Sequence, residues 1–357
     1  MASPDVGLQF HLPSHKGLGL LRLLELAKMA ESGGVKQVWV TDNLQNRNIF
    51  VTLAALAGAT DLELGTAIMV HYFRNPVDAA DSVAAVTELM GGSEISLGIG
   101  RGNIRTSNSI KTPAPLGMMR ETAQALSILF AGEELVASDF PTLSSYFNYA
   151  DTARFQLSFS PARDVRIYCG GDGPKTLAIG GAHMDGLLCG TTFRPIARMG
   201  RLPSLLKIFD DAADEAGKTG PRRRVAEIKI ALDSDPQVSR EFARHGVGSR
   251  VLGLRWRGYP PEDIARLGIT QEQIDRLEDV KRTSGDGTSQ ALAPLVTDEM
   301  IDAFYVAGDL GYCRDQIDEL LELADQYGFH QIIFSGISAD FGYGVRLLID
   351  EIMPSFS

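Results

Sequence analysis

Cysteine is scarce in this sequence, with three residues among 357, and the scarcity argues against two kinds of covalent stabilisation. Cys169, Cys189 and Cys313 are scattered along the chain, and none belongs to a C-x-x-C pair. Such spacing indicates neither a disulfide framework nor a cysteine zinc site. We therefore expect three buried thiols at strand positions, where cysteine behaves as a small apolar side chain.

Long apolar runs and long basic runs are also missing. No stretch approaches the roughly 18 apolar residues that a membrane span needs, and the first residues do not resemble a secretory signal. The formal net charge of -11 would repel phosphate backbones and anionic lipid surfaces. We expect a cytoplasmic protein that acts on a small molecule and binds neither nucleic acid nor membranes.

Several catalytic signatures are absent as well. Only Asp42 and Asp172 are carboxylates at expected strand ends, so a glycosidase pair is not indicated. The sequence has no H-x-H or H-E-x-x-H pattern and no Asp/Glu triad at strand ends, and we predict no metal site. A G-x-S-x-G nucleophile elbow is missing too. These absences favour a protein that binds a large cofactor and leaves the chemistry to it.

What the sequence does contain is a regular alternation of short β-prone runs and amphipathic segments. A chain of this length, with 44% hydrophobic residues, can bury a large core. About eight βα units predict an α/β fold, a (β/α)8 TIM barrel formed as one domain over residues 1–357. We expect buried parallel strands at residues 6–10, 37–41, 62–68, 95–99, 165–169, 186–189, 227–232 and 331–334. We expect helices at residues 18–32, 49–60, 76–90, 116–130, 175–181, 201–216 and 313–327.

Two segments interrupt this alternation. Residues 132–160 combine turn residues with alternating polarity, which predicts an inserted hairpin or excursion. Residues 233–306 combine helical patterns with frequent Gly, Pro and charge. This second insertion is long enough to cover the barrel mouth, where active sites of such barrels lie.

A glycine-rich loop is expected after the fifth strand, in "GGDGPKT" at residues 170–176. Its glycines allow close backbone approach, and Pro174 suits the first helical position. The amides that follow, with Lys175 and Thr176, would bind an anion. The spacing matches neither a P-loop nor a dinucleotide fingerprint, so a tight βα turn with a surface lysine is the alternative interpretation.

A second glycine-rich turn, "GIGRGN", follows the fourth strand. It places the guanidinium of Arg101 between Gly100 and Gly102, where it could hold a phosphate or an aromatic ring. Two such turns at one end of a barrel suggest a phosphorylated cofactor.

Five motifs in order along nearly the whole chain resemble the bacterial-luciferase-like superfamily of flavin and deazaflavin oxidoreductases. They are "VWVTDNLQNRN", "LELGTAIMVHYFRNPVDAA", "SLGIGRGN", "GGDGPKTLAIGGAHMDGLLCG" and "VAGDLGYCRDQIDELLELADQYGFHQIIF". The second strand end and the segment after the third strand are most similar to the branch that uses coenzyme F420 and includes methylenetetrahydromethanopterin reductase. Other branches bind FMN. The resemblance implies a (β/α)8 barrel and, as is usual in the family, a homodimer.

The resemblance also implies roles for individual residues. Asp42 would contact the polar edge of the cofactor ring, and Val70 would pack near it. Ala67 and Ile68 match the pair that carries a non-prolyl cis peptide in this family and forms a bulge behind the ring. The remaining residues implied to bind cofactor or substrate are Arg101, Gly102 and Asn103 beside the ring or phosphate, Gly173, Lys175 and Thr176 at the phosphate, and Thr191 at the substrate or cofactor tail.

Two departures from the family bear on the reaction. The sugar-phosphate dehydrogenases have a histidine after the aspartate and a glutamate after the fourth-strand glycines, where this chain has Asn43 and Asn103. Because an amide cannot act as a general base, oxidation of a sugar hydroxyl is disfavoured. His11 and His71 are the remaining candidates for proton transfer, and Asn43 is the third candidate catalytic residue.

We therefore predict hydride transfer from reduced F420 to a small organic acceptor. An FMN-dependent monooxygenase is the first alternative, and a non-catalytic binding subunit is the second.

Overall fold

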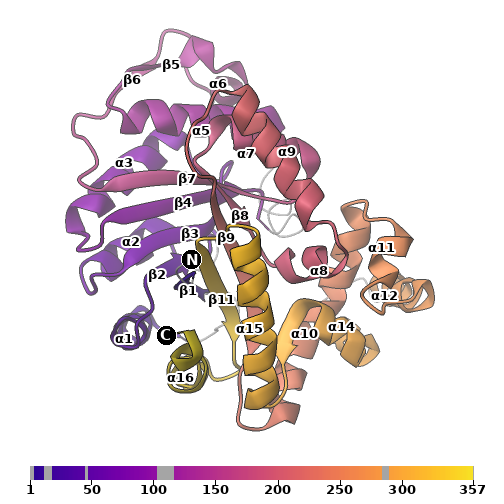
Figure 1. Cartoon of the computed structure of the whole chain (residues 1–357). Helices are drawn as coiled ribbons and strands as arrows, with labels where there is room; N and C mark the ends of the chain where they lie inside the picture. Colours follow the sequence, from indigo (N-terminus) through magenta and orange to yellow (C-terminus); the bar gives the residue numbers. More distant parts are fainter. Residues whose placement is uncertain (1–3, 12–17, 45–46, 103–115, 284–288, 357) are drawn as a thin grey trace. The chain divides into compact units, whose positions relative to one another are not determined.

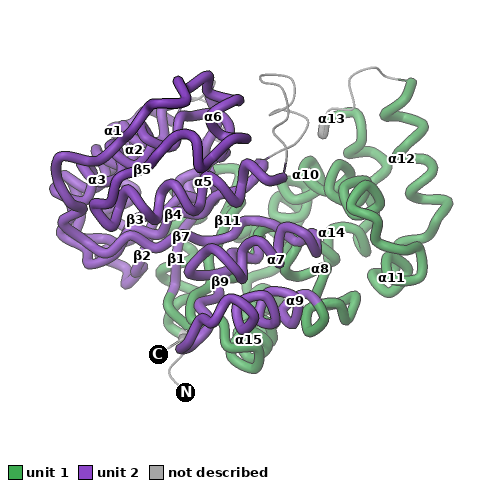
Figure 2. Tube along the Cα trace, turned by 90° about the horizontal axis from the view of Figure 1, so that it is seen from above, with its two compact units in different colours: residues 1–5, 190–204, 226–357 green, residues 6–189, 205–225 purple. Residues whose placement is uncertain are grey.

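The computed structural model describes residues 4–11, 18–44, 47–102, 116–283 and 289–356 (Figure 1). Contacts between Cα atoms divide the chain into two compact units, coloured separately in Figure 2. Unit 1 contains residues 1–5, 190–204 and 226–357, and unit 2 contains residues 6–189 and 205–225. The prediction of a single domain over 1–357 stays a prediction.

Unit 2 contains a run of parallel strands that alternate with helices. Neighbouring strands pair in the order β1-β2-β3-β4-β7-β8. The strands are β1 (Asp5–Phe10), β2 (Gln37–Val40), β3 (Glu63–Val70), β4 (Glu94–Gly100), β7 (Asp164–Gly170) and β8 (Gly186–Cys189). The helices are α1 (Leu20–Ser32), α2 (Ile49–Ala57), α3 (Pro76–Leu89), α5 (Leu116–Phe130), α7 (Pro174–His183) and α9 (Leu202–Glu215), the last of which begins in unit 1.

Local sequence explains where the helices after β2 and β3 begin. The side chain of Asn48 caps α2 by accepting the backbone N–H of Phe50 at 2.9 Å. Asn75 caps α3 by accepting the N–H of Val77 at 2.8 Å, and Pro76 occupies the first turn. Such caps satisfy backbone donors that a helix start leaves without a partner. The caps therefore fix where both helices begin. Each helix is connected to the preceding strand by a short segment at the carboxyl end of that strand, where functional groups of barrel enzymes lie.

The segment expected as an insertion at residues 132–160 contains a short antiparallel pair and a helix. Strand β5 (Leu135–Val136) pairs with β6 (Arg154–Phe155). Between them lie the 3-10 helix η2 (Ala137–Asp139) and the helix α6 (Pro141–Phe147). Asn148 ends α6 in the left-handed conformation, with φ of 56°. We call residues 132–160 the excursion below.

Unit 1 contains three strands, β9 (Arg223–Ala231), β10 (Tyr305–Ala307) and β11 (Gln331–Ile337), with β9 beginning at its border with unit 2. Strands β9 and β10 pair in parallel, with Lys229 opposite Tyr305. The helices of this unit are α8 (Phe193–Arg198), α10 (Pro236–Trp256), α11 (Pro261–Ala265), α12 (Gln271–Thr283), α13 (Ser289–Leu292), α14 (Asp298–Phe304), α15 (Leu310–Gln326) and α16 (Phe341–Leu347). Short turns η3 (Ala293–Leu295), η4 (Leu348–Ile352) and η5 (Met353–Phe356) complete it.

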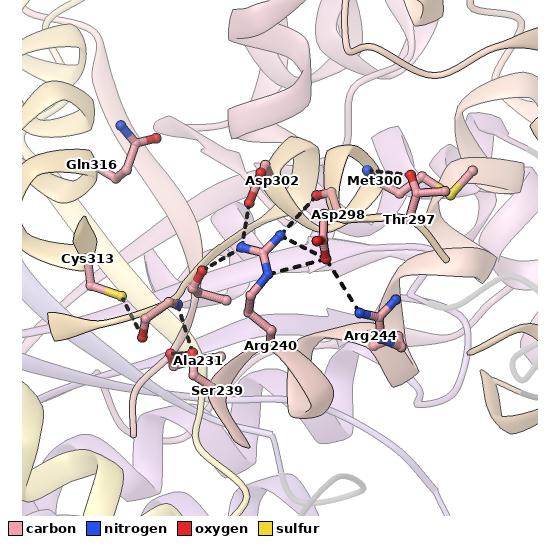
Figure 3. A network of polar contacts seen from close by, with 12 residues as sticks. Ala231, Ser239, Arg240, Arg244, Thr297, Asp298, Met300, Asp302, Cys313 and Gln316 are labelled. Carbon is pink, nitrogen blue, oxygen red and sulfur yellow. Dashed lines mark hydrogen bonds and ion pairs between the residues drawn. The ribbon is translucent and has the colours of Figure 1, made fainter. Parts of the chain in front are cut away.

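An arginine network joins the helices of the segment 233–306 to strand β10 (Figure 3). The guanidinium of Arg240 on α10 donates to Oδ1 of Asp302 and to the carbonyl oxygen of Ala307, both at 3.0 Å. Its Nη2 lies 3.1 Å from Oδ1 of Asp298. Arg244, one turn further along α10, reaches the same Asp298 oxygen at 3.4 Å. These contacts fix α10, α14 and β10 relative to one another within unit 1.

The fold is α/β, a (β/α)8 TIM barrel of eight parallel strands with surrounding helices. The described sheet has nine strands, because the short β10 pairs with β9 in addition to these eight. Each predicted strand overlaps an observed one. Strand β9 begins four residues before the predicted start at residue 227, and the short strand β10 was not predicted. The three cysteines are free thiols, of which Cys169 and Cys313 are buried as expected and Cys189 is half-buried. Cys313 lies in helix α15, so the expectation of a strand position was wrong for this residue.

Candidate active site

The end of strand β3 departs from regular strand geometry. The peptide bond between Ala67 and Ile68 is cis, which confirms the expectation drawn from the family resemblance. The pairing register against β4 shifts between Thr66 and Met69, so the two residues of the cis bond form a bulge. This bulge lies close to the carboxyl end of the strand, where barrel enzymes place their chemistry.

Groups from β1 and from the end of β2 hold the bulge. The carbonyl oxygen of Ala67 accepts a hydrogen bond from Nε2 of Gln9 at 3.0 Å and one from Oγ1 of Thr41 at 3.3 Å. The backbone N–H of Asp42 donates to the carbonyl oxygen of Ile68 at 3.1 Å. Both carbonyl groups of the bulge are thus satisfied from neighbouring strands.

Asp42 is a buried carboxylate with one oxygen engaged and one without a partner. Its Oδ2 accepts the backbone N–H of Val70 at 3.1 Å and a charged hydrogen bond from Arg74. The Asp42 side chain is fully buried and the Arg74 side chain is 9% exposed. The guanidinium of Arg74 also lies 5.4 Å from the ring centroid of Phe50. Oδ1 of Asp42 is buried and has no hydrogen-bond partner among the residues that the structure describes.

Three glycines form the ends of β4 and β7 beside this bulge, and we call Gly98, Gly100 and Gly170 the glycine rim. A Cβ atom on Gly98 would lie 2.3 Å from the carbonyl oxygen of Thr66, and one on Gly100 would lie 2.5 Å from that of Gly170. A Cβ atom on Gly170 would lie 2.4 Å from Cγ2 of Ile68. No larger residue fits at these positions without displacement, because the Ile68 side chain and main-chain oxygens occupy the space.

The loop after β7 leads into the first turn of α7. Gly173 is the residue before the helix, and no side chain caps the helix start. A Cβ atom on Gly171 would lie 2.8 Å from Cγ2 of Thr176, so the loop needs glycine there. Lys175 is exposed and Thr176 is half-buried. The first N–H groups of α7 have no partner within the helix, an arrangement that suits an anion.

The turn after β4 lies at the same end of the sheet as this loop, because Gly100 is paired with Gly170. Arg101 and Gly102 are exposed there, and Gly102 has φ of 64°, which favours glycine. Asn103 lies outside the described residues. The two glycine-rich turns are therefore neighbours, as a shared ligand requires.

His71 follows β3 directly and is buried. Its ring nitrogen Nδ1 lies 2.8 Å from the carbonyl oxygen of Gly100, and since a carbonyl only accepts, Nδ1 carries the proton. Burial lowers the pKa of His71 to about 4, helped by the positive charge of Arg101 and opposed by the bond to Gly100. His71 is therefore neutral at pH 7. Its Nε2 is buried without a partner among the described residues.

The other predicted residues occupy the ends of three further strands. His11 follows β1 and is half-buried, and the half-buried Asn43 follows Asp42. Thr191 lies two residues beyond β8, in unit 1. Their predicted roles stay predictions.

Sequence reasoning did not identify Arg74 or Gln9 as parts of this site. Arg74 lies in "HYFRNP", within the segment after the third predicted strand, and no role was predicted for it. The sequence offered one signal for Arg74: the predicted buried position of Asp42 at a strand end, because a buried carboxylate usually needs a cation as partner. Gln9 precedes the end of β1, and nothing in the sequence indicates that its amide turns toward β3.

Among the described residues, no group of three or more His, Cys, Asp or Glu side chains is placed to hold a metal ion. No described helix combines the length and the apolar character that a membrane crossing requires.

A family model described as luciferase-like monooxygenase matches residues 8–327 of the chain, which is most of its length. The chain belongs to this family. Like other members it is an enzyme of the flavin- or deazaflavin-dependent oxidoreductase class, and the recognition made from the sequence motifs is confirmed. Because the family name describes only part of its chemistry, individual relatives are more informative about the reaction.

A 5,10-methylenetetrahydromethanopterin reductase of Methanolobus tindarius is 29% identical over 345 residues, covering 94% of this chain and 96% of the relative. Two solved structures show the same fold over the whole of both chains. The F420-dependent tetrahydromethanopterin reductase of Methanopyrus kandleri superposes with a TM-score of 0.77 at 23% identity. An F420-dependent secondary alcohol dehydrogenase, solved with an F420-acetone adduct, superposes with a TM-score of 0.72 at 20% identity.

Proposed function

We propose that this member of the luciferase-like family is a reductase that uses coenzyme F420 and transfers a hydride to a small organic acceptor. The observation that carries the proposal is the buried Asp42 carboxylate, which faces the cis bulge of β3 next to two glycine-rich turns. Two solved structures of proteins named as F420-dependent, which match this chain over its whole length, support it.

The residues fit the proposed cofactor in three respects. Oδ1 of Asp42 is a buried acceptor without a partner among the described residues, and a ring N–H would satisfy it. Ile68 at the cis bulge is half-buried and apolar, whereas Val70, predicted to pack near the ring, is buried in the structure. The start of α7, with Gly173, provides free N–H groups for a phosphate.

Coenzyme F420 supplies hydride chemistry when it is bound. The tasks left to the chain are to hold the ring, orient the acceptor and limit access of water. Asp42 would orient the ring edge, and the ion pair with Arg74 would hold the Asp42 carboxylate in place. Lys175 and Thr176 would hold the phosphate, while the exposed Arg101 would add positive charge at the same end of the sheet.

Methylenetetrahydromethanopterin is the acceptor to test first, because a reductase of that compound matches 94% of this chain. We propose His11 and Asn43 as catalytic residues, as predicted. For His71 we propose a different role from the predicted proton transfer. A neutral His71 that donates to Gly100 is better suited to fixing the glycine rim than to giving up a proton at pH 7.

Two titrations test the cofactor. The purified protein is titrated with F420 and with FMN, and quenching of the fluorescence of each cofactor is followed. We expect saturable micromolar binding of F420 and at least tenfold weaker binding of FMN. Selective binding of FMN would instead support the monooxygenase alternative, and failure to bind either cofactor would support the non-catalytic one.

Turnover is then tested with reduced F420 and methylenetetrahydromethanopterin by following the reappearance of F420 absorbance.

Asp42→Asn should reduce F420 affinity by roughly tenfold, because the amide presents a weaker acceptor and loses the charge paired with Arg74. Unchanged affinity in this variant would contradict the role of Asp42.

We also propose, from the family resemblance alone, that the protein is a homodimer. Light scattering coupled to gel filtration should give a mass near twice 38.6 kDa. A monomer mass at micromolar concentration would refute this.

A further inference from the structure

The segment between β3 and α3 carries Arg74 and is fixed at both of its ends. At its start, the backbone N–H of Phe73 donates to the carbonyl oxygen of Val70 at 3.0 Å, which closes a turn directly after the strand. At its end, the side-chain oxygen of Asn75 caps α3. Arg74 lies between these two points. Both of them therefore help to direct its guanidinium toward Asp42.

The oxygen that caps α3 receives a second hydrogen bond, from the excursion. The hydroxyl of Tyr149 donates to Oδ1 of Asn75, the same atom that accepts the backbone N–H of Val77 at 2.8 Å. Burial raises the pKa of Tyr149, opposed by the bond to Asn75 and helped by the Asp78 charge, so the hydroxyl is a protonated donor at pH 7. This bond connects two residues that are 74 positions apart in the sequence.

Tyr149 is held in place by the excursion itself. Its ring lies against that of Phe155 on β6, with ring centroids 4.8 Å apart. Its backbone N–H donates to the carbonyl oxygen of Ser144 in α6 at 2.9 Å. Helix α6 is in turn fixed to α5, where Oε2 of the buried Glu121 accepts the backbone N–H of Leu143 at 2.8 Å. The hydroxyl is therefore presented to α3 from a preformed support.

These contacts form a chain from the excursion to the buried carboxylate of the candidate site. Tyr149 bonds to Asn75, and the next residue toward β3 is Arg74, which pairs with Oδ2 of the carboxylate. Oδ1 of the same carboxylate is the acceptor that we assign to the cofactor ring. Because a guanidinium is rigid and planar, its bond to a carboxylate depends closely on geometry. A shift of the chain at residue 75 would therefore change how Asp42 is held.

We propose that Tyr149 is a positioning residue for the cofactor site, because its hydroxyl, acting through Asn75, fixes the ion pair beside it. Arg74 then holds Asp42 in the orientation that meets the ring edge. This inference rests on the proposed F420-dependent function and adds to it a residue from outside the strand ends. The excursion is then a support of the cofactor site.

Titration of the purified protein with F420, followed by quenching of the cofactor fluorescence, tests the proposal. Tyr149→Phe removes only the hydroxyl, and Oδ1 of Asn75 still accepts the N–H of Val77. The variant should bind F420 roughly fivefold more weakly, the size expected for one hydrogen bond. Thr142→Val is the matched control, because it removes a hydroxyl from the same excursion and keeps the shape of a half-buried side chain. Its affinity should stay within twofold of the wild-type value.

A double-mutant cycle with Arg74→Lys separates positioning from a merely structural role. Lysine keeps a positive charge for Asp42 but carries it on a flexible stem, which depends little on the exact path of the chain at residue 75. In the Arg74→Lys background, Tyr149→Phe should therefore change F420 affinity by less than twofold. A structural role would give the same fivefold loss in both backgrounds, because independent effects add.

Three results would overturn the proposal. They are unchanged F420 affinity in Tyr149→Phe, an equal loss with and without Arg74→Lys, and a comparable loss in Thr142→Val. Failure of the wild-type protein to bind F420 is a separate result, which would remove the proposed function and this inference together.

Discussion

At the scale of single residues, the candidate site is defined by side chains that are fixed at one atom and open at another. Asp42 is held through Oδ2 and His71 through Nδ1, while Oδ1 and Nε2 remain buried without partners among the described residues. Buried polar atoms without partners are rare and costly in folded proteins. His71 lies three residues beyond the cis bulge in sequence, and Asp42 bonds directly to Ile68. Their position beside the bulge supports the functional role proposed for this part of the chain.

The ion pair between Arg74 and Asp42 gives the first test at this scale. Arg74→Met leaves a buried carboxylate without its cation, so we expect the free energy of unfolding at pH 7 to fall by about 3 kcal/mol. Urea denaturation measures it. Arg74→Met combined with Asp42→Asn removes both charges and should recover part of the loss. If the single and the double variant are equally destabilised, the pair does not couple as described.

The titration of His71 gives a second test. Its pKa is about 4 in the folded protein and near 6.5 when unfolded, so the unfolded chain binds more protons between these values. This contribution to stability is complete above pH 6.5 and is lost as the pH falls toward 4. At pH 4.5 it should cost the wild-type protein about 2 to 3 kcal/mol.

The variant His71→Asn can keep a donor toward Gly100 but does not titrate. Urea unfolding of both proteins at pH 7.0 and 4.5 separates the effect of His71 from that of other groups. We expect the wild-type protein to lose more stability on acidification than the variant, by the same 2 to 3 kcal/mol. Equal losses would mean that His71 is not held neutral by burial.

At the scale of elements, the glycine rim is closely packed, and its residue Gly170 is joined by a short loop to the start of α7. Gly170→Ala would bring a Cβ atom to 2.4 Å from the Ile68 side chain, and overpacking of this kind costs about 1–3 kcal/mol. We expect that loss in urea denaturation, together with weaker F420 binding as the bulge shifts. Gly117→Ala on α5 is the control, because its new Cβ meets nothing closer than 3.9 Å and should be neutral or stabilising. Equal effects of the two changes would argue against the close packing of the rim.

Most of these elements could be predicted from sequence because periodicity and turn residues are local signals. The glycine loops at 98–102 and 170–176 were found in this way, whereas the pair Ala67 and Ile68 was identified only through the family resemblance. The short strand β10 was missed, because three residues carry too little periodicity. The contact of Arg74 with Asp42 spans 32 positions, and α6 meets β3 only through tertiary packing. Pairings across such distances leave no local pattern to read.

At the scale of the whole molecule, free thiols lie in both units: Cys169 and Cys189 in unit 2 and Cys313 in unit 1. Burial, with the nearby Asp172 charge, raises the pKa of Cys169 and of Cys189 to about 12, and burial, helped by Asp309, raises that of Cys313 to about 11. Since the thiolate is the reactive form, we expect almost no reaction with a disulfide reagent at pH 8 in the native protein. Three equivalents should react after denaturation.

The rate of this reaction, followed at intermediate urea concentrations, reports the opening of each unit. Cys313→Ala leaves only the two thiols of unit 2, so comparison with the wild-type protein separates the two contributions. A thiol that reacts at once in the native protein would show that the corresponding element is more accessible than described.

The glycine rim has a consequence for how this protein could have diversified. Its shape is set by main-chain atoms of β3, β4 and β7 and by the Ile68 side chain, while the excursion is anchored separately through Glu121. Mutations in the excursion can therefore accumulate without disturbing the glycine rim, since barrels diverge chiefly through their connecting segments. One ancestral redox scaffold could in this way give rise to a series of enzymes with unrelated substrates.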